Sequence, residues 1–265
     1  MSLRSQVGAI RRGILASLHR RTVSLGRRGP IITFTFDDFP RTALTNGAAI
    51  LETFGARGTY YVAGSLMNQT NQLGEQFRRE DILTLLDRGH EVASHTFHHS
   101  SARRVSFKKF QQDAEDGERG IQELADVLSS GNFAYPYGEA TLQSKGKLGP
   151  RFVSSRGTCG GLNGPEVDLN LLRANNLYGG LERAESAKRR VEENKRLGQW
   201  LIFYTHDVTD APSPYGCTLE LLETVCGYAK AENMRFMTVA DVMRELGQTA
   251  SSLECVPGTA LSASR

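Results

Sequence analysis

Three short stretches of this sequence carry carboxylates and imidazoles directly after apolar, strand-like runs. The residues concerned are Asp37 and Asp38, His95, His98 and His99, and His206 with Asp207. Two imidazoles and one carboxylate form a three-ligand set for a divalent metal, with coordination positions left for water and substrate. Adjacent carboxylates can divide the work, one binding metal and the other accepting a proton from water. The pattern therefore indicates metal-assisted hydrolysis.

Each stretch, taken alone, also has an ordinary structural explanation. A carboxylate pair before Phe39-Pro40 could end a strand and cap a turn, and His206 could be a hydrogen-bonded core imidazole. The joint occurrence at three strand ends favours a site. His98 lies between two candidate ligands and His90 at the other end of its strand, so both are expected to be structural.

The elements that must position these residues alternate between strand-like and helix-like sequence. Strands are expected at 31–36, 59–64, 91–96, 133–138, 152–157, 200–206 and 235–239, with a further one near residue 177, and helices at 43–54, 76–88, 106–128, 183–197 and 218–232. Such alternation gives parallel strands with right-handed crossovers, so the fold class is α/β and the expected architecture is a (β/α) barrel. An open doubly wound sheet is the alternative. In a barrel the carboxyl ends of the strands meet at one mouth, which would bring the three stretches together.

Composition and charge bound the remaining classes. The 265 residues are 39% hydrophobic and 23% charged, and no apolar run approaches the ~20 residues of a membrane-spanning helix. Seven of the 32 basic residues are arginines in residues 1–28, which leaves 25 against 29 acidic residues. Nucleic acid is therefore not an expected partner. The organisation expected is a basic segment, 1–28, with helical periodicity, a barrel at 29–247 and a flexible tail at 248–265.

The basic segment and the cysteines leave two questions open. Residues 1–28 could pack on the core as a helix or contact an anionic membrane surface. The four cysteines show no CxxC spacing, which indicates reduced thiols, although Cys217 and Cys226 could pair. No secretory leader is recognisable, so a cytoplasmic location is expected; a removed leader would place the protein outside the cytoplasm. The sequence does not indicate an oligomeric state.

The quoted stretches resemble the motifs of a known family. Residues 35–38 (TFDD) and 95–99 (HTFHH) are similar to the first two motifs of the polysaccharide deacetylases with a NodB homology domain, carbohydrate esterase family 4. Residues 133–138 resemble the third motif and residues 200–208 the last one. The resemblance covers roughly residues 30–245. It implies a distorted barrel of seven or eight (β/α) units that holds one divalent metal, usually zinc.

The resemblance also implies a role for each site residue. Asp37 would be the general base, His206 the general acid that protonates the leaving amine, and the backbone N–H of Tyr137 would help to hold the oxyanion. These roles suit a carboxylate, an imidazole and an amide donor near neutral pH. The implied metal ligands are Asp38, His95 and His99.

Departures from the family pattern concern the substrate more than the metal. Phe39 replaces the usual Gly after the two Asp, which predicts a bulkier rim. Ala134 stands where the third motif usually has the Arg that orients the base, and Arg173 or Arg156 could replace it from another strand. Tyr204 replaces a Leu near His206. Further candidates for binding or orienting the substrate are Asp207 and the aromatic platforms Tyr135, Tyr137 and Tyr215.

The function expected from this reasoning is hydrolysis of N-acetyl groups on an amino-sugar polymer or sugar-lipid, with an N-acetylated carbohydrate as the partner. One alternative is a hydrolase of a small cyclic amide, allantoinase-like, on the same fold. Another is a non-catalytic carbohydrate-binding relic. A third is a cysteine hydrolase, because Gly157-Thr158-Cys159-Gly160-Gly161 matches a nucleophile-elbow pattern, although chain-breaking residues follow it.

Overall fold

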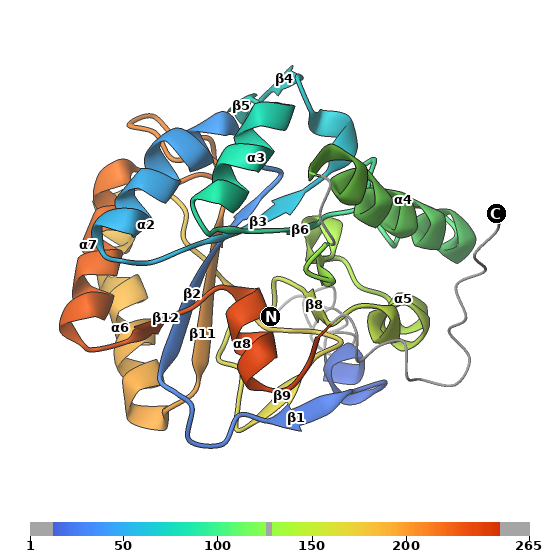
Figure 1. Ribbon diagram of the computed structural model, residues 1–265. Coiled ribbons are helices and arrows are strands. Elements are labelled where there is room, and N and C mark those ends of the chain that lie inside the picture. The colour runs from blue at the N-terminus through green and yellow to red at the C-terminus, as the bar shows by residue number, and fades with distance from the viewer. Residues whose placement is uncertain (1–12, 126–128, 250–265) are drawn as a thin grey trace, which may run out of the picture.

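Parallel strands form the sheet that carries the candidate residues (Figure 1). The computed structural model describes residues 13–125 and 129–249. The strands run in the order β10-β11-β2-β3-β6-β7-β8, with β12 beside the start of β2. Within the described residues no strand ladder joins β8 to β10, so the barrel is distorted and open at this point, and the α/β barrel expectation is confirmed. The strands are β2 (Ile31–Asp37), β3 (Thr59–Val62), β6 (Glu91–Ser94), β7 (Asn132–Ala134), β8 (Ser154–Arg156), β10 (Asn175–Asn176), β11 (Trp200–Thr205) and β12 (Arg235–Phe236).

Amphipathic helices cover the outside of this sheet. In Figure 1, α2, α6 and α7 lie on one side of the strands and α4 and α5 on the other. On α4, Phe110, Ala114, Ile121 and Ala125 are buried at helical spacing, so this face packs inward. The helices are α2 (Ala49–Thr53), α3 (Arg79–Asp87), α4 (Phe107–Ala125), α5 (Leu142–Lys147), α6 (Ala184–Leu197), α7 (Leu219–Ala231) and α8 (Val239–Glu245), with the short turns η1 (Ala43–Ala48), η2 (Gly64–Leu66), η3 (Pro136–Gly138), η4 (Gly149–Arg151) and η5 (Leu181–Arg183).

The last helix, α8, closes the amino-terminal end of the barrel. The backbone N–H of Val239 donates to Oγ1 of Thr59 at 3.0 Å. The backbone N–H of Ala240 donates to Oε2 of Glu91 at 2.8 Å. Thr59 and Glu91 are the first residues of β3 and β6, so the first turn of α8 is tied to the bottom of the sheet. The carboxyl ends of the strands are left to build the site.

The described part of the basic amino-terminal segment packs on the barrel. Residues 13–17 are helical, and β1 (Thr22–Ser24) pairs antiparallel with β9 (Glu166–Asp168). The fully buried Lys145 binds Asp168 at 2.7 Å and donates to the carbonyl of Leu15 at 2.7 Å, which fixes the segment in place. Membrane contact of the basic segment, residues 1–28, stays a prediction. Residues 1–12 of that segment and the tail from residue 250 onward lie outside the described residues.

Most expected elements are present with shifted ends. The strand expected at 133–138 is wrong beyond Ala134, because Pro136 begins a 3₁₀ turn in which Tyr137 has a φ of 60°. The hairpin of β4 (Thr70–Asn71) and β5 (Gly74–Glu75) and the helix α5 were not expected. None of the described helices is both long and apolar enough to cross a lipid bilayer.

Candidate active site

The end of β2 presents two carboxylates on one sharp turn. Asp37 closes the strand, and Asp38 and Phe39 both have a φ of 63°, in the left-handed region. This turn breaks the alternation that would point Asp37 and Asp38 to opposite faces of the sheet. The Phe39 ring is fully buried and stacks on Phe77 with centroids 5.3 Å apart. The expectation of a bulkier rim at Phe39 is therefore wrong, because this side chain anchors the turn from within.

The loop after β6 is fixed by helix α4. A Cβ at Gly117 would meet the backbone carbon of Thr96 at 2.5 Å, so only glycine lets α4 lie this close. Asp113 of α4 accepts hydrogen bonds from the backbone N–H of His98 at 2.8 Å and of Ser100 at 3.3 Å. Its carboxylate also contacts Nδ1 of His98 at 2.7 Å. His98 therefore faces α4, as expected of a structural residue.

The structure brings Asp38, His95 and His99 together. Their ligand atoms lie within 4.8 Å of one another. Oδ1 of Asp38 lies 3.2 Å from Nε2 of His99 and 3.8 Å from Nε2 of His95. The other ring nitrogen of His95, Nδ1, lies 2.8 Å from the carbonyl oxygen of Ala134, which places the ring proton there. The Nε2 lone pair of His95 is thus directed at a carboxylate.

This set of atoms fits a divalent cation. Oδ1 of Asp38 is buried and has no hydrogen-bond partner among the described residues. Burial raises the pKa of Asp38 to about 6, lowers the pKa of His95 to about 3 and also lowers the pKa of His99. Electron-rich atoms that face one another without a proton repel, and a cation held by all three would remove this cost. Two imidazoles and a carboxylate are a donor set for a catalytic metal with open positions.

Asp37 is paired with a buried arginine from β8. Oδ1 of Asp37 forms a buried ion pair and hydrogen bond with a guanidinium nitrogen of Arg156. The guanidinium carbon lies 4.8 Å from the ring centre of Tyr61 and 5.3 Å from that of Tyr204. Burial raises the pKa of Asp37, but the positive charge and the hydrogen bond of Arg156 counteract burial, and the pKa is lowered overall. Asp37 is therefore held ionised.

The two arginines considered from the sequence differ in place. Arg156 is fully buried against Asp37, whereas Arg173 is exposed and donates to the carbonyl of Gly160 at 3.0 Å. Of the two, the structure brings only Arg156 to Asp37. The sequence signal was a lone arginine that ends a short buried strand of small residues. The flanking rings of Tyr61 and Tyr204 had no comparable signal.

His206 is oriented by the loop that follows β11. Its Nδ1 lies 3.1 Å from the carbonyl oxygen of Tyr215. Asp207 accepts hydrogen bonds from the backbone N–H of Ser213 at 2.7 Å and from its hydroxyl at 2.6 Å. A Cβ at Gly216 would meet the Asp207 carboxyl carbon at 2.4 Å. Asp207 thus points into its own loop and shapes the turn that presents Tyr215.

The predicted aromatic platforms separate into exposed and buried rings. Tyr137 is 57% exposed, and its ring centre lies 4.5 Å from that of His99. Tyr215 is 50% exposed and lies 5.8 Å from the His206 ring. Tyr135 is 1% exposed and packs in the core beside aromatic rings of α4 and β7, so its ring does not reach the mouth.

The cysteine pattern has no elbow geometry. In the described chain, Cys159 lies in a segment followed by isolated bridges and β9 rather than by a helix. Cys217 and Cys226 are buried free thiols, and burial raises the pKa of Cys217 to about 12. Burial raises the pKa of Cys226 as well, so neither buried thiol has the lowered pKa of a reactive nucleophile.

Comparison with known proteins agrees with this geometry. The sequence model of one family, polysaccharide deacetylase, matches residues 26–149. No curated protein sequence matches the chain. Among solved structures, a family 4 acetyl xylan esterase from Clostridium thermocellum, in complex with a cobalt ion, is 20% identical with a TM-score of 0.55, over 84% of this chain and 96% of that one.

Two further solved structures share the fold. The Xyl-CE4 domain of a multidomain xylanase from the hindgut metagenome of Trinervitermes trinervoides is 18% identical with a TM-score of 0.53, over 83% of this chain and 98% of that one. A peptidoglycan N-acetylglucosamine deacetylase is 14% identical with a TM-score of 0.53, over 84% and 91%. The family model matches the part of the chain that carries the first two motifs, which confirms the resemblance there, and the solved structures share the distorted barrel fold.

Proposed function

We propose that this protein is a metal-dependent hydrolase that removes N-acetyl groups from an amino-sugar polymer or a sugar-lipid. The observation that carries the proposal is the pair of neighbouring carboxylates with opposite environments. Asp38 has a buried oxygen without a partner beside His95 and His99, whereas Asp37 is ion-paired with Arg156. Two carboxylates kept distinct in this way suit a ligand and a base.

The metal would be held by Asp38, His95 and His99. When bound, zinc or a similar divalent ion would polarise the acetyl carbonyl and make water more acidic. The set has two nitrogens and one oxygen, which zinc accepts readily. The hydrogen bond from His95 to the carbonyl of Ala134 would keep its ring in the ligating orientation.

The remaining residues would move protons and stabilise charge. Asp37, kept ionised by Arg156, would take a proton from the water that attacks the acetyl carbon. The backbone N–H of Tyr137 would donate to the developing oxyanion, a contribution of roughly 10²–10³ in kcat. His206, whose Nδ1 faces the carbonyl of Tyr215, would give a proton from Nε2 to the leaving nitrogen. The products balance as acetate and a free amine.

A sugar suits the mouth better than a small cyclic amide. The rings of Tyr137 and Tyr215 are half exposed, the first beside His99 and the second beside His206. Exposed aromatic rings provide apolar faces for the C–H side of a pyranose. A compact amide would leave both rings in water.

The experiment is metal analysis together with acetate release. We expect about one divalent ion per chain, lost in His95→Ala, and acetate release from N-acetylglucosamine oligomers that requires the ion. The matched control is His98→Ala, which changes a neighbouring imidazole that faces α4. Absence of metal from the wild type after metal is added back would overturn the proposal, as would undiminished acetate release in Asp37→Asn.

A further inference from the structure

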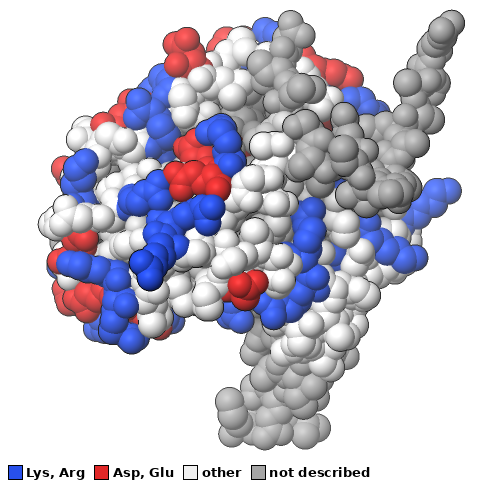
Figure 2. All heavy atoms as spheres, turned by 60° about the horizontal axis from the view of Figure 1, so that its bottom comes forward, with Lys and Arg blue, Asp and Glu red and all other residues white. Residues whose placement is uncertain are grey.

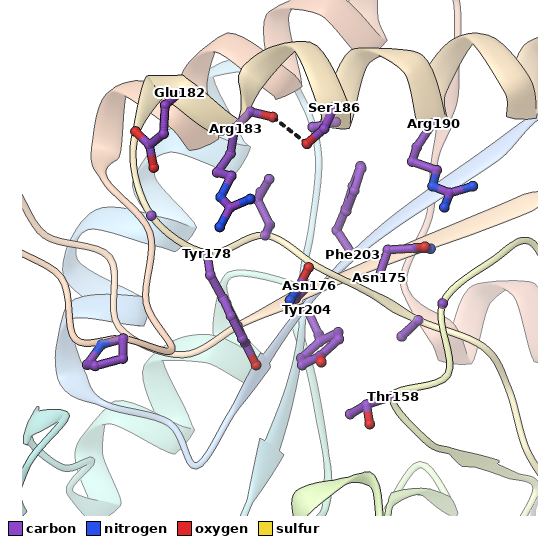
Figure 3. Close-up of a pocket in the computed structure, with 16 residues that line it drawn as sticks. Thr158, Asn175, Asn176, Tyr178, Glu182, Arg183, Ser186, Arg190, Phe203 and Tyr204 are labelled. Atoms are coloured by element: carbon purple, nitrogen blue, oxygen red, sulfur yellow. Dashed lines mark hydrogen bonds between the residues drawn. The ribbon is translucent and has the colours of Figure 1, made fainter. Parts of the chain in front are cut away.

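A cavity of about 580 Å³ adjoins the candidate active site between β10, β11 and helix α6 (Figure 3). Its volume is within the range of sites for small molecules. Tyr178 and Tyr204 form the wall toward the catalytic residues. The Tyr178 ring lies 6.0 Å from the His206 ring, and the Tyr204 ring lies 5.3 Å from the guanidinium carbon of Arg156. The edge of the cavity at Tyr178 and Tyr204 thus lies directly beside the proposed acid and the partner of the proposed base.

The opposite wall is one face of α6 and the turn before it. Arg183, Ser186 and Arg190 line the cavity at helical spacing. Figure 3 shows both arginines extending from this helix on the side that faces Tyr178 and Asn176. The Ser186 hydroxyl donates to the backbone carbonyl of Arg183 at 2.9 Å, so the two guanidinium groups are the donors on this side, and tyrosine rings line the other.

The charges of this wall are not neutralised from within. No hydrogen bond or ion pair between side chains holds the Arg183 guanidinium in the described part of the chain, and Arg190 contacts Glu193 on the outer surface at 2.8 Å. The one acidic residue on the lining, Glu182, accepts a hydrogen bond from the backbone N–H of Gly180 at 2.9 Å. The lining therefore carries two guanidinium groups and one carboxylate; Arg190 is paired with Glu193 outside the lining, so Arg183 is the guanidinium on the lining that no side chain pairs with in the described residues. The first turn of α6 adds the positive end of its dipole.

We propose that this cavity binds an anionic group, a carboxylate or a phosphate, carried by the N-acetylated sugar. Guanidinium groups bind both anions through paired N–H donors. The hydroxyl of Thr158 and the amide of Asn176 provide hydrogen bonds for the sugar itself. The inference rests on the proposed function and narrows its substrate: a charged amino sugar, with the acetamide at Asp37 and His206 and the anion beyond Tyr178.

Isothermal titration calorimetry on the full-length, metal-loaded protein tests this inference. The probes are N-acetylglucosamine, N-acetylglucosamine 1-phosphate and N-acetylmuramic acid, which are neutral, phosphorylated and carboxylated. We expect at least one anionic probe to bind about tenfold tighter than the neutral sugar at low salt, and this preference to shrink as salt is raised. The tighter of the two anions identifies the source of the charge.

Variants assign the preference to the cavity rather than to the metal site, which also attracts anions. Arg183→Gln and Arg190→Gln should each lose most of the preference and leave the Kd of the neutral sugar unchanged. Arg189→Gln, on the same helix but outside the cavity lining, is the matched control and should keep it. Equal Kd values for neutral and anionic sugars in the wild type would overturn the inference, as would an equal loss in Arg189→Gln.

Acetate release separates this inference from the proposed function. If neutral oligomers are deacetylated equally well by the wild type and Arg183→Gln and no anionic preference exists, the inference fails and the function stands. If no substrate releases acetate but the anionic preference depends on Arg183, the function fails and the anion site stands.

Discussion

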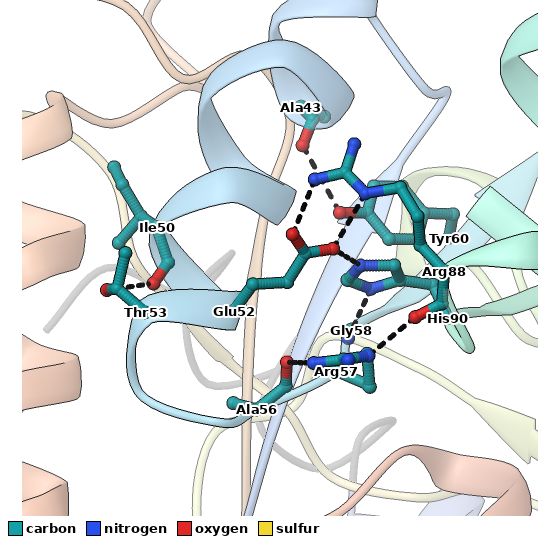
Figure 4. A network of polar contacts seen from close by, with 10 residues as sticks. All are labelled: Ala43, Ile50, Glu52, Thr53, Ala56, Arg57, Gly58, Tyr60, Arg88 and His90. Atoms are coloured by element: carbon teal, nitrogen blue, oxygen red, sulfur yellow. Dashed lines mark hydrogen bonds and ion pairs between the residues drawn. The ribbon is translucent and has the colours of Figure 1, made fainter. Parts of the chain in front are cut away.

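The two ends of the barrel each hold a histidine beside a carboxylate, but the two groups differ in how their polar atoms are satisfied. At the amino-terminal end, Nε2 of His90 lies 2.8 Å from Glu52, and its Nδ1 accepts the backbone N–H of Gly58 at 2.9 Å (Figure 4). Arg88 donates to both oxygens of Glu52, at 2.8 and 2.7 Å. We call His90, Glu52 and Arg88 the amino-terminal cluster. Every ring nitrogen and carboxylate oxygen of this cluster has a protein partner.

At the mouth, the carboxyl-terminal end of the barrel, some polar atoms have no such partner. Oδ1 of Asp38 is buried without a hydrogen-bond partner, and Nε2 of His95 and of His99 face it. Buried polar atoms without partners are costly, so a fold keeps them where something else supplies the missing interaction. Polar satisfaction, rather than residue type or burial, separates a histidine that holds the fold from one that is available to a ligand.

The largest effect is expected when one histidine at each end of the barrel is substituted and the two variants are compared. His95→Gln removes a ligating nitrogen, so metal content should fall to near zero and acetate release by at least 10³-fold. His90→Gln removes a structural hydrogen bond, so it should lower stability and leave metal content near one per chain. Elemental analysis and acetate assays on both variants decide the matter. Metal loss in His90→Gln equal to that in His95→Gln would show that the two ends do not differ as argued.

A second prediction concerns the ion pair between Arg156 and Asp37. Arg156→Lys keeps the charge but loses the planar group held beside Tyr61 and Tyr204, so kcat should fall about 10–100-fold through misplacement of the base. KM and metal content should stay the same, which distinguishes positioning from ligation. Arg173→Ala is the control and should match the wild type. A wild-type kcat in Arg156→Lys would remove the orienting role.

The stability of the same pair gives a third prediction. Arg156→Ala leaves a buried carboxylate unpaired and should destabilise the fold by about 3–5 kcal/mol. Adding Asp37→Asn should recover part of this loss, because the unpaired charge is then gone. Urea unfolding of the two single variants and the double variant measures the coupling. Strictly additive losses would mean that the two side chains do not interact.

The sequence predicted the cluster of candidate ligands better than the residues that support it. That Asp38, His95 and His99 lie together could be anticipated from their types and from their places at strand ends. Ala134 stands where the third motif usually has an arginine, and the sequence offered two arginines, Arg156 and Arg173, in its place. Only the order of strands in the sheet decides which of the two reaches Asp37. The inward direction of Phe39 depends on a positive φ at a turn, which no spacing reveals.

A fourth prediction concerns how the stability contributed by the amino-terminal cluster depends on pH. The hydrogen bonds from Arg88, partly offset by burial, lower the pKa of Glu52 to about 2, and burial lowers the pKa of His90 below its ordinary value. Both groups release protons more readily when folded, so their stabilisation is present at neutral pH. It is lost as pH falls, below about 6.5 for His90 and from about 4.5 toward 2 for Glu52.

Glu52→Gln should therefore cost about 1 kcal/mol at pH 7, a modest value because the pair is partly solvated, and less at pH 3.5. Urea unfolding at pH 7, 4.5 and 3.5 measures this, with acetate release at pH 7 as the functional control. A difference from the wild type that grows on acidification would contradict the assigned direction.

The smallest effect is expected at the rim of the mouth. Tyr137→Ala removes an exposed ring beside His99 but keeps the backbone N–H assigned to the oxyanion, so KM for N-acetylglucosamine oligomers should rise roughly 3–10-fold with kcat nearly unchanged. Tyr228→Ala is the matched control, because that ring lies on α7 and its hydroxyl contacts Glu192 at 2.8 Å. A large loss of kcat in Tyr137→Ala would mean that the side chain, and not the backbone donor, acts in the transition state. In that case the polar groups that act on the substrate would include the Tyr137 side chain at the rim as well as the residues around Asp38.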